Sequence, residues 1–305
     1  IKYDGTNWNS VGSAGIGSPM GCCGYDDIGF AIDSNNVPYV AFVDSYNSNK
    51  VTVLGYTGSS WAVVGTVGFT KPVERVSLSI DSSNTLYISV EDTLNHKATV
   101  MKFEQSQSKK FWKNAGNTGS YSNNSEIVNI VSDSNNTKYV AFSDSDQNDK
   151  ATVIKYDGLN SWSRVGNAGF TKDRADWVSI AISQSGNPYI AFSDASQPDT
   201  GNIGKVSVMR YLGGIAGWVN IGKPGFSQYG AEYTRLAIDR NDTPYVVFVD
   251  NNPKLNNPLT VMKYDGKNWV PVGAPGFSKG TAWYPSITFD NLNTPYVSYR
   301  DQSTG

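Results

Sequence analysis

Acidic residues recur at two fixed places in a repeated phrase, and carboxylates at such spacing could bind a cation, accept hydrogen bonds from sugar hydroxyls, or act as an acid and a base. Each of the six copies of the phrase holds a tyrosine, in stretches such as PYVAF. Thirteen residues before this tyrosine stand Asp26, Glu74, Glu126, Asp176, Glu232 and, in the last copy, Trp283. Five residues after it stand Asp44, Asp92, Asp144, Asp194, Asp250 and Asp301.

The first of these two columns is not explained by turn chemistry. Three of the five glutamates of the chain fall in it, whereas turns favour aspartate, whose short side chain can bond its own backbone. Trp283 breaks the acidic column, and Trp177 and Tyr284 are its neighbours in register. Aromatic rings beside carboxylates suit sugars, which offer apolar C–H faces and hydroxyl donors. The sequence therefore predicts a glycan site at these eight positions: Asp26, Glu74, Glu126, Asp176, Glu232, Trp283, Trp177 and Tyr284.

The second column, of aspartates, has two open interpretations. These carboxylates could accept backbone hydrogen bonds and pair with the lysine that starts the next strand in most copies, as Lys50 and Lys150 do. They could instead bind Ca²⁺, because hard cations prefer carboxylate oxygens. We expect the two columns to lie opposite each other across a hairpin at one mouth of a channel, where facing like charges would need such compensation.

Repeats decide the fold that must position these residues. Six tryptophans, at 50 to 56 residue intervals, are each followed four residues later by glycine, from Trp8 and Gly12 to Trp269 and Gly273. Each unit contains four short apolar or alternating runs separated by turn residues, and no helical period is present. This pattern predicts an all-β, six-bladed β-propeller with four antiparallel strands per blade. A phenylalanine in the connection between blades (Phe69, Phe170, Phe226 and Phe277) is expected to pack between them.

The chain is expected to form one domain of six blades. Five are contiguous and one combines both ends of the chain: 28–65, 76–116, 126–166, 177–222, 234–273, and 284–299 with 1–12. The N-terminal fragment IKYDGTNWNSVG matches VMKYDGKNWVPVG near the other end, so it is predicted to supply the two outer strands of the last blade and close the ring. Closure would remove the open sheet edges.

Stretches such as SIAI followed by PYVAF, with a fourth strand that ends in glycine, resemble the blades of NHL-repeat propellers. The resemblance covers the whole chain and implies an architecture and protein-interaction roles. This chain has Asn-Thr-Pro where those repeats carry Gly-Asn, and mostly Lys where they carry Arg. The YDG turn before Trp8, Trp162 and Trp269 resembles a shortened sialidase Asp-box. Neither resemblance carries an activity with it, because propellers host unrelated functions.

Composition excludes several classes of function. A net charge of −2 offers no basic field for nucleic acid, and the chain has no apolar run of 18 residues, so neither a nucleic-acid partner nor membrane insertion is expected. His96 is the only histidine, and no nucleophile motif accompanies it. Cys22 and Cys23 are adjacent, which leaves free thiols, a vicinal disulfide or a link to another chain.

These observations favour a non-enzymatic, extracellular or cell-surface binding module, lectin-like and glycan-binding, with Ca²⁺ as a candidate ion. One alternative is a structural, self-associating or adhesin repeat protein. A second alternative is a glycoside hydrolase or lyase that uses paired carboxylates.

Overall fold

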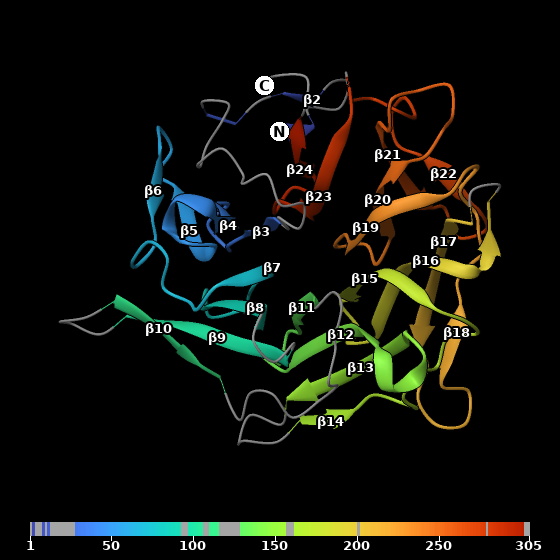
Figure 1. Cartoon of the computed structure of the whole chain (residues 1–305), viewed down its shortest axis with the longest axis horizontal. Coiled ribbons are helices and arrows are strands. Elements are labelled where there is room, and N and C mark those ends of the chain that lie inside the picture. The colour runs from blue at the N-terminus through green and yellow to red at the C-terminus, as the bar shows by residue number, and fades with distance from the viewer. Residues whose placement is uncertain are drawn as a thin grey trace.

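The computed structural model of the protein describes residues 2–3, 8–9, 11–12, 28–92, 97–105, 110–115, 129–156, 162–199, 202–278 and 280–301. Antiparallel sheets of four strands are arranged around a centre as the blades of a propeller (Figure 1). Two short 3-10 helices, η1 (Ser45–Asn47) and η2 (Ser145–Gln147), follow the second strands of two blades. No helix in the described part of the chain is long and apolar enough to span a bilayer. The predicted all-β propeller is confirmed.

Five blades are each built from one contiguous stretch of chain, with strands in sequence order. The first contains β3 (Ile28–Ile32), β4 (Pro38–Asp44), β5 (Lys50–Tyr56) and β6 (Trp61–Val63). The second contains β7 (Val73–Ile80), β8 (Leu86–Asp92), β9 (Lys97–Gln105) and β10 (Lys110–Asn114). The third contains β11 (Asn129–Ser132), β12 (Lys138–Asp144), β13 (Lys150–Tyr156) and β14 (Trp162–Arg164). The fourth contains β15 (Ala175–Ile182), β16 (Pro188–Pro198), β17 (Gly204–Tyr211) and β18 (Trp218–Asn220). The fifth contains β19 (Ala231–Ile238), β20 (Pro244–Asp250), β21 (Leu259–Tyr264) and β22 (Trp269–Pro271).

A sixth sheet joins the two ends of the chain in the order β2-β1-β24-β23. Its inner strands are β23 (Ala282–Phe289) and β24 (Pro295–Asp301), and its outer strands, β1 (Lys2–Tyr3) and β2 (Trp8–Asn9), have two residues each. Lys2 pairs with Tyr296 on β24. Five blades and this smaller sheet are therefore present, and closure of a ring by the sheet stays a prediction.

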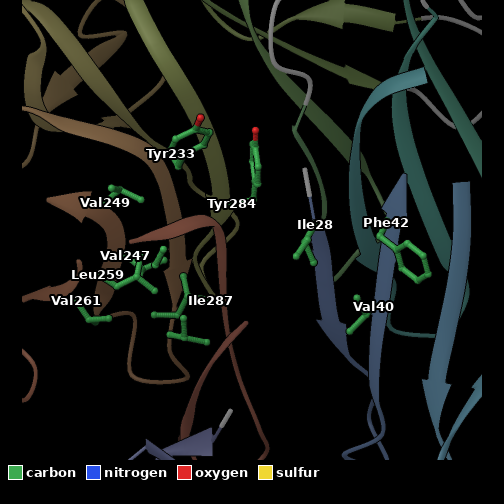
Figure 2. Packing of buried hydrophobic residues seen from close by; sticks show 12 residues of the cluster. Ile28, Val40, Phe42, Tyr233, Val247, Val249, Leu259, Val261, Tyr284 and Ile287 are labelled. Carbon is green, nitrogen blue, oxygen red and sulfur yellow. The ribbon is translucent and has the colours of Figure 1, made fainter. Parts of the chain in front are cut away.

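The core lies between blades. The second strand of a blade is covered on both faces, so its PYVAF-type run is apolar almost throughout instead of alternating. Phe142, Phe192 and Phe248 of these runs are among the largest fully buried side chains. Figure 2 shows one cluster in which Val247 and Leu259 of the fifth blade pack towards Ile287 of β23. Burial of one such side chain contributes about 1.5–3 kcal/mol.

In the second, fourth and fifth blades the repeated tryptophan fastens the blade to the one before it. Trp218 Nε1 donates to the carbonyl of Val165 at 2.9 Å, and its ring stacks on Phe170 with centroids 4.3 Å apart. Trp112 and Trp269 repeat both contacts, with the carbonyls of Val64 and Ile221 and with stacked Phe69 and Phe226. The expectation that these phenylalanines pack between blades is confirmed.

The glycine four residues after a tryptophan makes room for the tryptophan of the next blade at Gly12, Gly65, Gly166 and Gly222. Gly166 has φ +80°, and a Cβ there would lie 3.0–3.2 Å from Tyr211 and Trp218. Gly12 in the N-terminal fragment has φ +71° and would meet Tyr56 and Trp61 of the first blade at 3.0–3.2 Å. Gly12 therefore approaches Trp61 as closely as Gly166 approaches Trp218. The Nε1 atom of Trp61, however, is buried and has no hydrogen-bond partner among the described residues.

The hairpins between first and second strands form a chain of hydrogen bonds from blade to blade on one face. Within each hairpin an aspartate holds the turn, as where Asp33 Oδ1 accepts from the backbone N–H groups of Asn35 and Val37. Between hairpins, an Asn or Asp with positive φ accepts a backbone N–H from the preceding blade. The bonds are Ser34 N to Asn84, Ser82 N to Asn136, Gln184 N to Asp242, Arg240 N to Asn293, and Asn291 N to Asn36. The last of these joins β23–β24 to the first blade.

Candidate functional site

A β-bulge near the start of the innermost strand shapes the predicted site. It falls between Asp176 and Ser179 in the fourth blade, and between Glu232 and Arg235 in the fifth. Equivalent bulges occur at Val73/Val76 and at Trp283/Ser286. Because the bulge lets pairing continue beyond it, β15 begins at Ala175 and β19 at Ala231, two or three residues earlier than predicted.

The bulge also changes which residues face each other. Below it Ile180 pairs with Ile190, a register that would bring Asp176 opposite Asp194. Above it Asp176 pairs with Ser193, and Asp194 pairs with Ala175. Successive residues of a strand point to opposite faces. The expectation that the two acidic columns oppose each other is therefore wrong, because one extra residue separates their side chains.

Three aromatic residues occupy the bulge in three successive sheets. Trp177, Tyr233 and Tyr284 have φ of 55°, 53° and 52°, a left-handed conformation that is unusual for bulky side chains. Such conformations cost of order 1–3 kcal/mol each and persist only where surrounding contacts impose them. Sequence reasoning placed Trp177 and Tyr284 at the site and missed Tyr233, which stands at the same position in its blade.

The rings form one cluster at the end of the channel. The centroid of Tyr233 lies 4.0 Å from Trp177, 4.7 Å from Tyr284 and 5.3 Å from Trp283. Figure 2 shows the Tyr233 and Tyr284 rings side by side, with both hydroxyls directed away from the apolar core. Arg75 of the second blade places its guanidinium 5.6 Å from the Trp177 centroid. Since Arg75 and Trp177 come from blades that are not neighbours in the chain, this contact reaches across the propeller.

Burial differs within the aromatic cluster. Tyr233 and Tyr284 are only 6% and 4% exposed, whereas Trp177 and Trp283 are partly exposed. The Nε1 atom of Trp283 is buried and has no hydrogen-bond partner among the described residues. The two tyrosines therefore lie inside the cluster, and the two tryptophans leave part of their indole surface exposed.

Some residues of the first acidic column lie beside the aromatic cluster. Glu232 is partly buried, and this burial raises the pKa of its carboxyl group, while a hydrogen bond from Asn251 acts in the opposite direction. Asp176 forms an ion pair with Arg174 at 3.0 Å, and Glu74 is partly exposed. Asp26 and Glu126 lie outside the described residues, as do His96, Cys22 and Cys23. The structure thus brings Glu232 and Asp176 next to the aromatic residues that follow them in the chain.

The aspartates of the second column bind hydroxyl groups on the third strand of their own blade. The hydroxyls of Thr52, Thr152 and Ser207 donate to Oδ2 of Asp44, Asp144 and Asp194 at 2.7–2.8 Å. Thr260 donates to Asp250 at 3.2 Å. Each hydroxyl then accepts a backbone N–H from the connection between blades: Gly68, Gly169, Gly225 and Gly276. Sequence reasoning missed these hydroxyls, although a Thr or Ser recurs at this place in each of the four blades.

These contacts give the second column a structural role. Asp44, Asp144 and Asp194 are buried, and their carboxylates fix the connection between blades through one intermediate hydroxyl. The side chain of Asp92 lies outside the described residues, and Asp301 is partly exposed. Among the residues that the structure describes, no group of three or more His, Cys, Asp or Glu side chains is placed to hold a metal ion. Calcium binding stays a prediction.

Comparison with known proteins identifies the architecture. No protein-family model and no curated protein matches the sequence. Among solved structures, the SapL1 lectin in complex with alpha methyl fucoside has a TM-score of 0.62 at 14% identity, over 91% of this chain and 90% of that one. Aleuria aurantia lectin, described as a six-bladed β-propeller with a novel mode of fucose recognition, has a TM-score of 0.58 at 16% identity, over 84% and 80%. The chain is a β-propeller.

The same propeller fold also occurs in an enzyme. The gluconolactonase XC5397 from Xanthomonas campestris has a TM-score of 0.53 at 12% identity, over 90% of this chain and 82% of that one. At such identities the likeness concerns the fold alone. None of the three proteins is described as an NHL-repeat protein, so that resemblance stays an expectation.

Proposed function

We propose that this propeller is a non-enzymatic, extracellular, lectin-like module that binds a glycan at the channel mouth formed by Trp177, Tyr233, Trp283 and Tyr284. The observation that carries the proposal is the aromatic cluster itself. Three of its members hold a left-handed backbone in three successive sheets, and such strain gathers at binding sites more often than elsewhere.

The chemistry of the mouth suits a sugar. The partly exposed indoles of Trp177 and Trp283 can stack on the apolar C–H face of a pyranose ring. Glu232, next to the cluster on β19, can accept hydrogen bonds from sugar hydroxyls when it is ionised. Two of the solved propellers with this fold are described in complex with, or as recognising, fucose, which supports a glycan as the ligand class.

We propose one such site in each chain. The aromatic position is filled by Trp177, Tyr233 and Tyr284 on one side of the mouth, whereas the second blade has Arg75 there. A ligand that needs adjacent aromatic faces finds them at one side only. We therefore expect one glycan per chain instead of one per blade.

We further propose that the β2-β1-β24-β23 sheet completes a sixth blade and closes the ring. Two contacts support this. Gly12 abuts Trp61 as Gly166 abuts Trp218, and Asn291 donates from its backbone to Asn36 at 2.9 Å, as the other hairpins do.

A glycan array, probed once with Ca²⁺ and once with a chelator, tests the proposed function and the candidate ion together. Hits are then titrated by calorimetry with Trp283→Ala and Trp177→Ala, each expected to weaken binding at least tenfold because a stacking face is lost. Tyr46→Ala is the matched control, since Tyr46 is 73% exposed on η1, in the first blade. No hit on the array, or equal affinity in all variants, would refute the proposal. Glycans that still bind in the presence of the chelator would show that binding does not need Ca²⁺.

The hydrolase alternative is favoured by one observation, the raised pKa of Glu232, which is what a general acid needs. Any hydrolysis of an array hit should then disappear in Glu232→Gln and persist in Glu104→Gln. Glu104 forms ion pairs with Lys102 and Lys113 on the outer strands and serves as the control.

A further inference from the structure

Two exposed asparagines stand at the same place in the third and fifth blades. Asn135 and Asn241 each lie four residues before the repeated tyrosine, at the tip of the hairpin between the first and second strands. They begin the sequences Asn-Asn-Thr and Asn-Asp-Thr, which match the Asn-x-Thr acceptor pattern for N-linked glycosylation. A further sequence of this pattern starts at Asn123, outside the described residues. Both acceptor sequences in the described part of the chain therefore share one structural position.

The hairpin turn is held without the side chain of its exposed asparagine. Asp133 Oδ1 accepts the backbone N–H groups of Asn135 and Thr137 at 2.9 and 2.8 Å. In the fifth blade Asp239 holds the backbone of Asn241 in the same way, at 2.8 Å. Both asparagines are exposed, and their carboxamides have no hydrogen-bond partner among the described residues. A sugar attached to Nδ2 would therefore break none of the bonds that form the turn.

The next residue of the turn, in contrast, is engaged with the preceding blade. Asn136 Oδ1 accepts the backbone N–H and the hydroxyl of Ser82 at 3.1 and 2.9 Å. The hydroxyls of Thr137 and Thr243, which complete the two acceptor sequences, make no hydrogen bond within the described structure, and both residues are partly exposed. The hairpin thus uses one residue to join the blades and leaves its neighbour, Asn135, open to solvent.

The hairpin tips lie far from the aromatic cluster. In the fifth blade Tyr233 stands near the start of β19 (Ala231–Ile238), and Asn241 follows the end of this strand. A strand rises about 3.3 Å per residue, so the tip is roughly 20 Å from the ring of Tyr233. A glycan at the tip would leave the proposed binding site at the mouth uncovered.

We propose that Asn135 and Asn241 are attachment sites for N-linked glycans. The donor is a lipid-linked oligosaccharide pyrophosphate: a bond forms between Nδ2 and the anomeric carbon, the anomeric C–O bond to the pyrophosphate breaks, and Nδ2 loses one proton as the lipid pyrophosphate leaves. The inference rests on the extracellular location in the proposed function, but not on glycan binding by the mouth. Because such glycans are bulky and solubilising, they would keep another copy from packing against the hairpin face.

The first blade supplies a matched control. Asn35 occupies the same turn position, is exposed, and donates its backbone N–H to Asp33 at 2.8 Å. Val37, however, stands where the third blade has Thr137, so the acceptor sequence lacks its hydroxyl. Asn35 should therefore carry no glycan in the wild type, and Val37→Thr should create a new attachment site.

Secretion of the whole chain from yeast behind a leader peptide tests the sites. Peptides are analysed by mass spectrometry before and after treatment with peptide N-glycosidase F, which converts each glycosylated Asn to Asp and so locates it. We expect glycans on Asn135 and Asn241. Thr137→Val should remove the glycan from Asn135 alone, and the fold should tolerate it because valine already fills this position in the first blade. Asn135→Gln is a second variant that should give the same loss.

A secreted, folded wild type without sugar on both Asn135 and Asn241 overturns the proposal, as does a Thr137→Val variant that keeps the glycan on Asn135. Sugar on Asn35 of the wild type would also overturn it. Trp283→Ala should be glycosylated like the wild type, because attachment does not involve the mouth. A chain that carries both glycans but binds nothing on the glycan array refutes the proposed function and supports this inference.

Discussion

The left-handed bulge residues show how one backbone conformation can gather a site. Trp177, Tyr233 and Tyr284 each stand at a bulge with a left-handed backbone, and the Tyr233 ring contacts the rings of the other two. The contacts and burial of the two tyrosines offset the backbone cost. The site therefore depends on the bulge as much as on the identity of its aromatic residues.

Asp250 carries a residue-scale prediction about pH. Burial raises the pKa of its carboxyl group, with a weaker contribution from Asp199, while Thr260 and the backbone of Asn252 oppose the shift. Its Oδ1 atom is buried with no hydrogen-bond partner in the described structure. A raised pKa in the folded state means that the folded protein binds a proton at a pH where the unfolded chain, with the ordinary value of 3.8, does not.

Wild-type stability relative to Asp250→Asn should therefore increase as the pH falls from neutral through this raised pKa, and level off below the unfolded value. Urea unfolding at closely spaced pH values measures it. Asp265→Asn is the control of opposite sign. Backbone N–H groups of Asn268 and Lys267 lower the pKa of Asp265, so the wild type should lose stability relative to this control as the pH falls. Parallel curves for wild type and Asp250→Asn would contradict the prediction.

Sequence reasoning grouped Trp177, Trp283 and Tyr284, which do lie in one aromatic cluster, but it did not give the geometry of that cluster. The positions of Trp177, Trp283 and Tyr284 followed from register alone, because copies of a repeat place equivalent residues alike. The bulge could not be predicted, since its residues are aromatic and left-handed turns are expected at Gly or Asn. The consequent error was to set Asp176 opposite Asp194.

The aspartate, hydroxyl and glycine contacts form the element that fixes each connection between blades. In the third blade Thr152 is fully buried, donates to Asp144 at 2.7 Å and accepts from the backbone of Gly169 at 3.0 Å. Thr152→Val keeps the shape and removes the hydroxyl, which leaves two buried polar groups unsatisfied. We expect a loss of about 1–3 kcal/mol in the free energy of unfolding.

Chemical denaturation of Thr152→Val beside Thr57→Val provides the measurement. Thr57 bonds within an exposed turn through Ser60, so its replacement should change stability by less than about 0.5 kcal/mol. Equal effects of the two substitutions would show that the buried hydroxyl contributes nothing specific.

The hairpin face contains one junction without the Asn or Asp contact. Gly186 stands in the fourth blade where Asn36, Asn84 and Asn136 stand in theirs, with φ +79° and no atom within 4 Å of a built Cβ. Gly186→Asn should let the new side chain accept the backbone N–H of Ser134. An increase of about 0.5–1 kcal/mol in unfolding free energy is expected from the bond and from the stiffer unfolded chain.

Thermal and urea unfolding of Gly186→Asn are compared with those of Gly186→Ala. Alanine adds a Cβ at a positive φ but no acceptor, so it should destabilise by about 1–2 kcal/mol. If Asn is as destabilising as Ala, the hairpin hydrogen bond is not the source of stability assumed here.

At the scale of the whole molecule, the N-terminal fragment carries the largest predicted effect. Removing residues 1–12 would delete β1 and β2, expose the edge of β24 and remove Gly12 from its contact with Trp61. We expect a large fall in melting temperature together with aggregation through the open edge. Removing residues 302–305 is the control and should change little. An unaltered melting temperature in the first variant would show that the fragment does not close the ring.

The global fold was the part most predictable from sequence. Six tryptophans in phase with six PYVAF-type runs leave few arrangements other than stacked sheets around a centre. The buried hydroxyls Thr152 and Ser207 were overlooked because a lone Thr or Ser inside an apolar strand has no pattern of its own.

The hydrogen bonds between hairpins indicate where else in the fold the chain could begin and end. The backbone N–H of Asn291 donates to the side chain of Asn36, which is the same bond that joins consecutive blades. On the hairpin face, the junction between β23–β24 and the first blade is therefore equivalent to the other bonded junctions. The least connected junction on that face lies elsewhere, between Ser134 and Gly186. A circular permutant that joins the present ends by a linker and starts afresh between the third and fourth blades should therefore rebuild the same sheets.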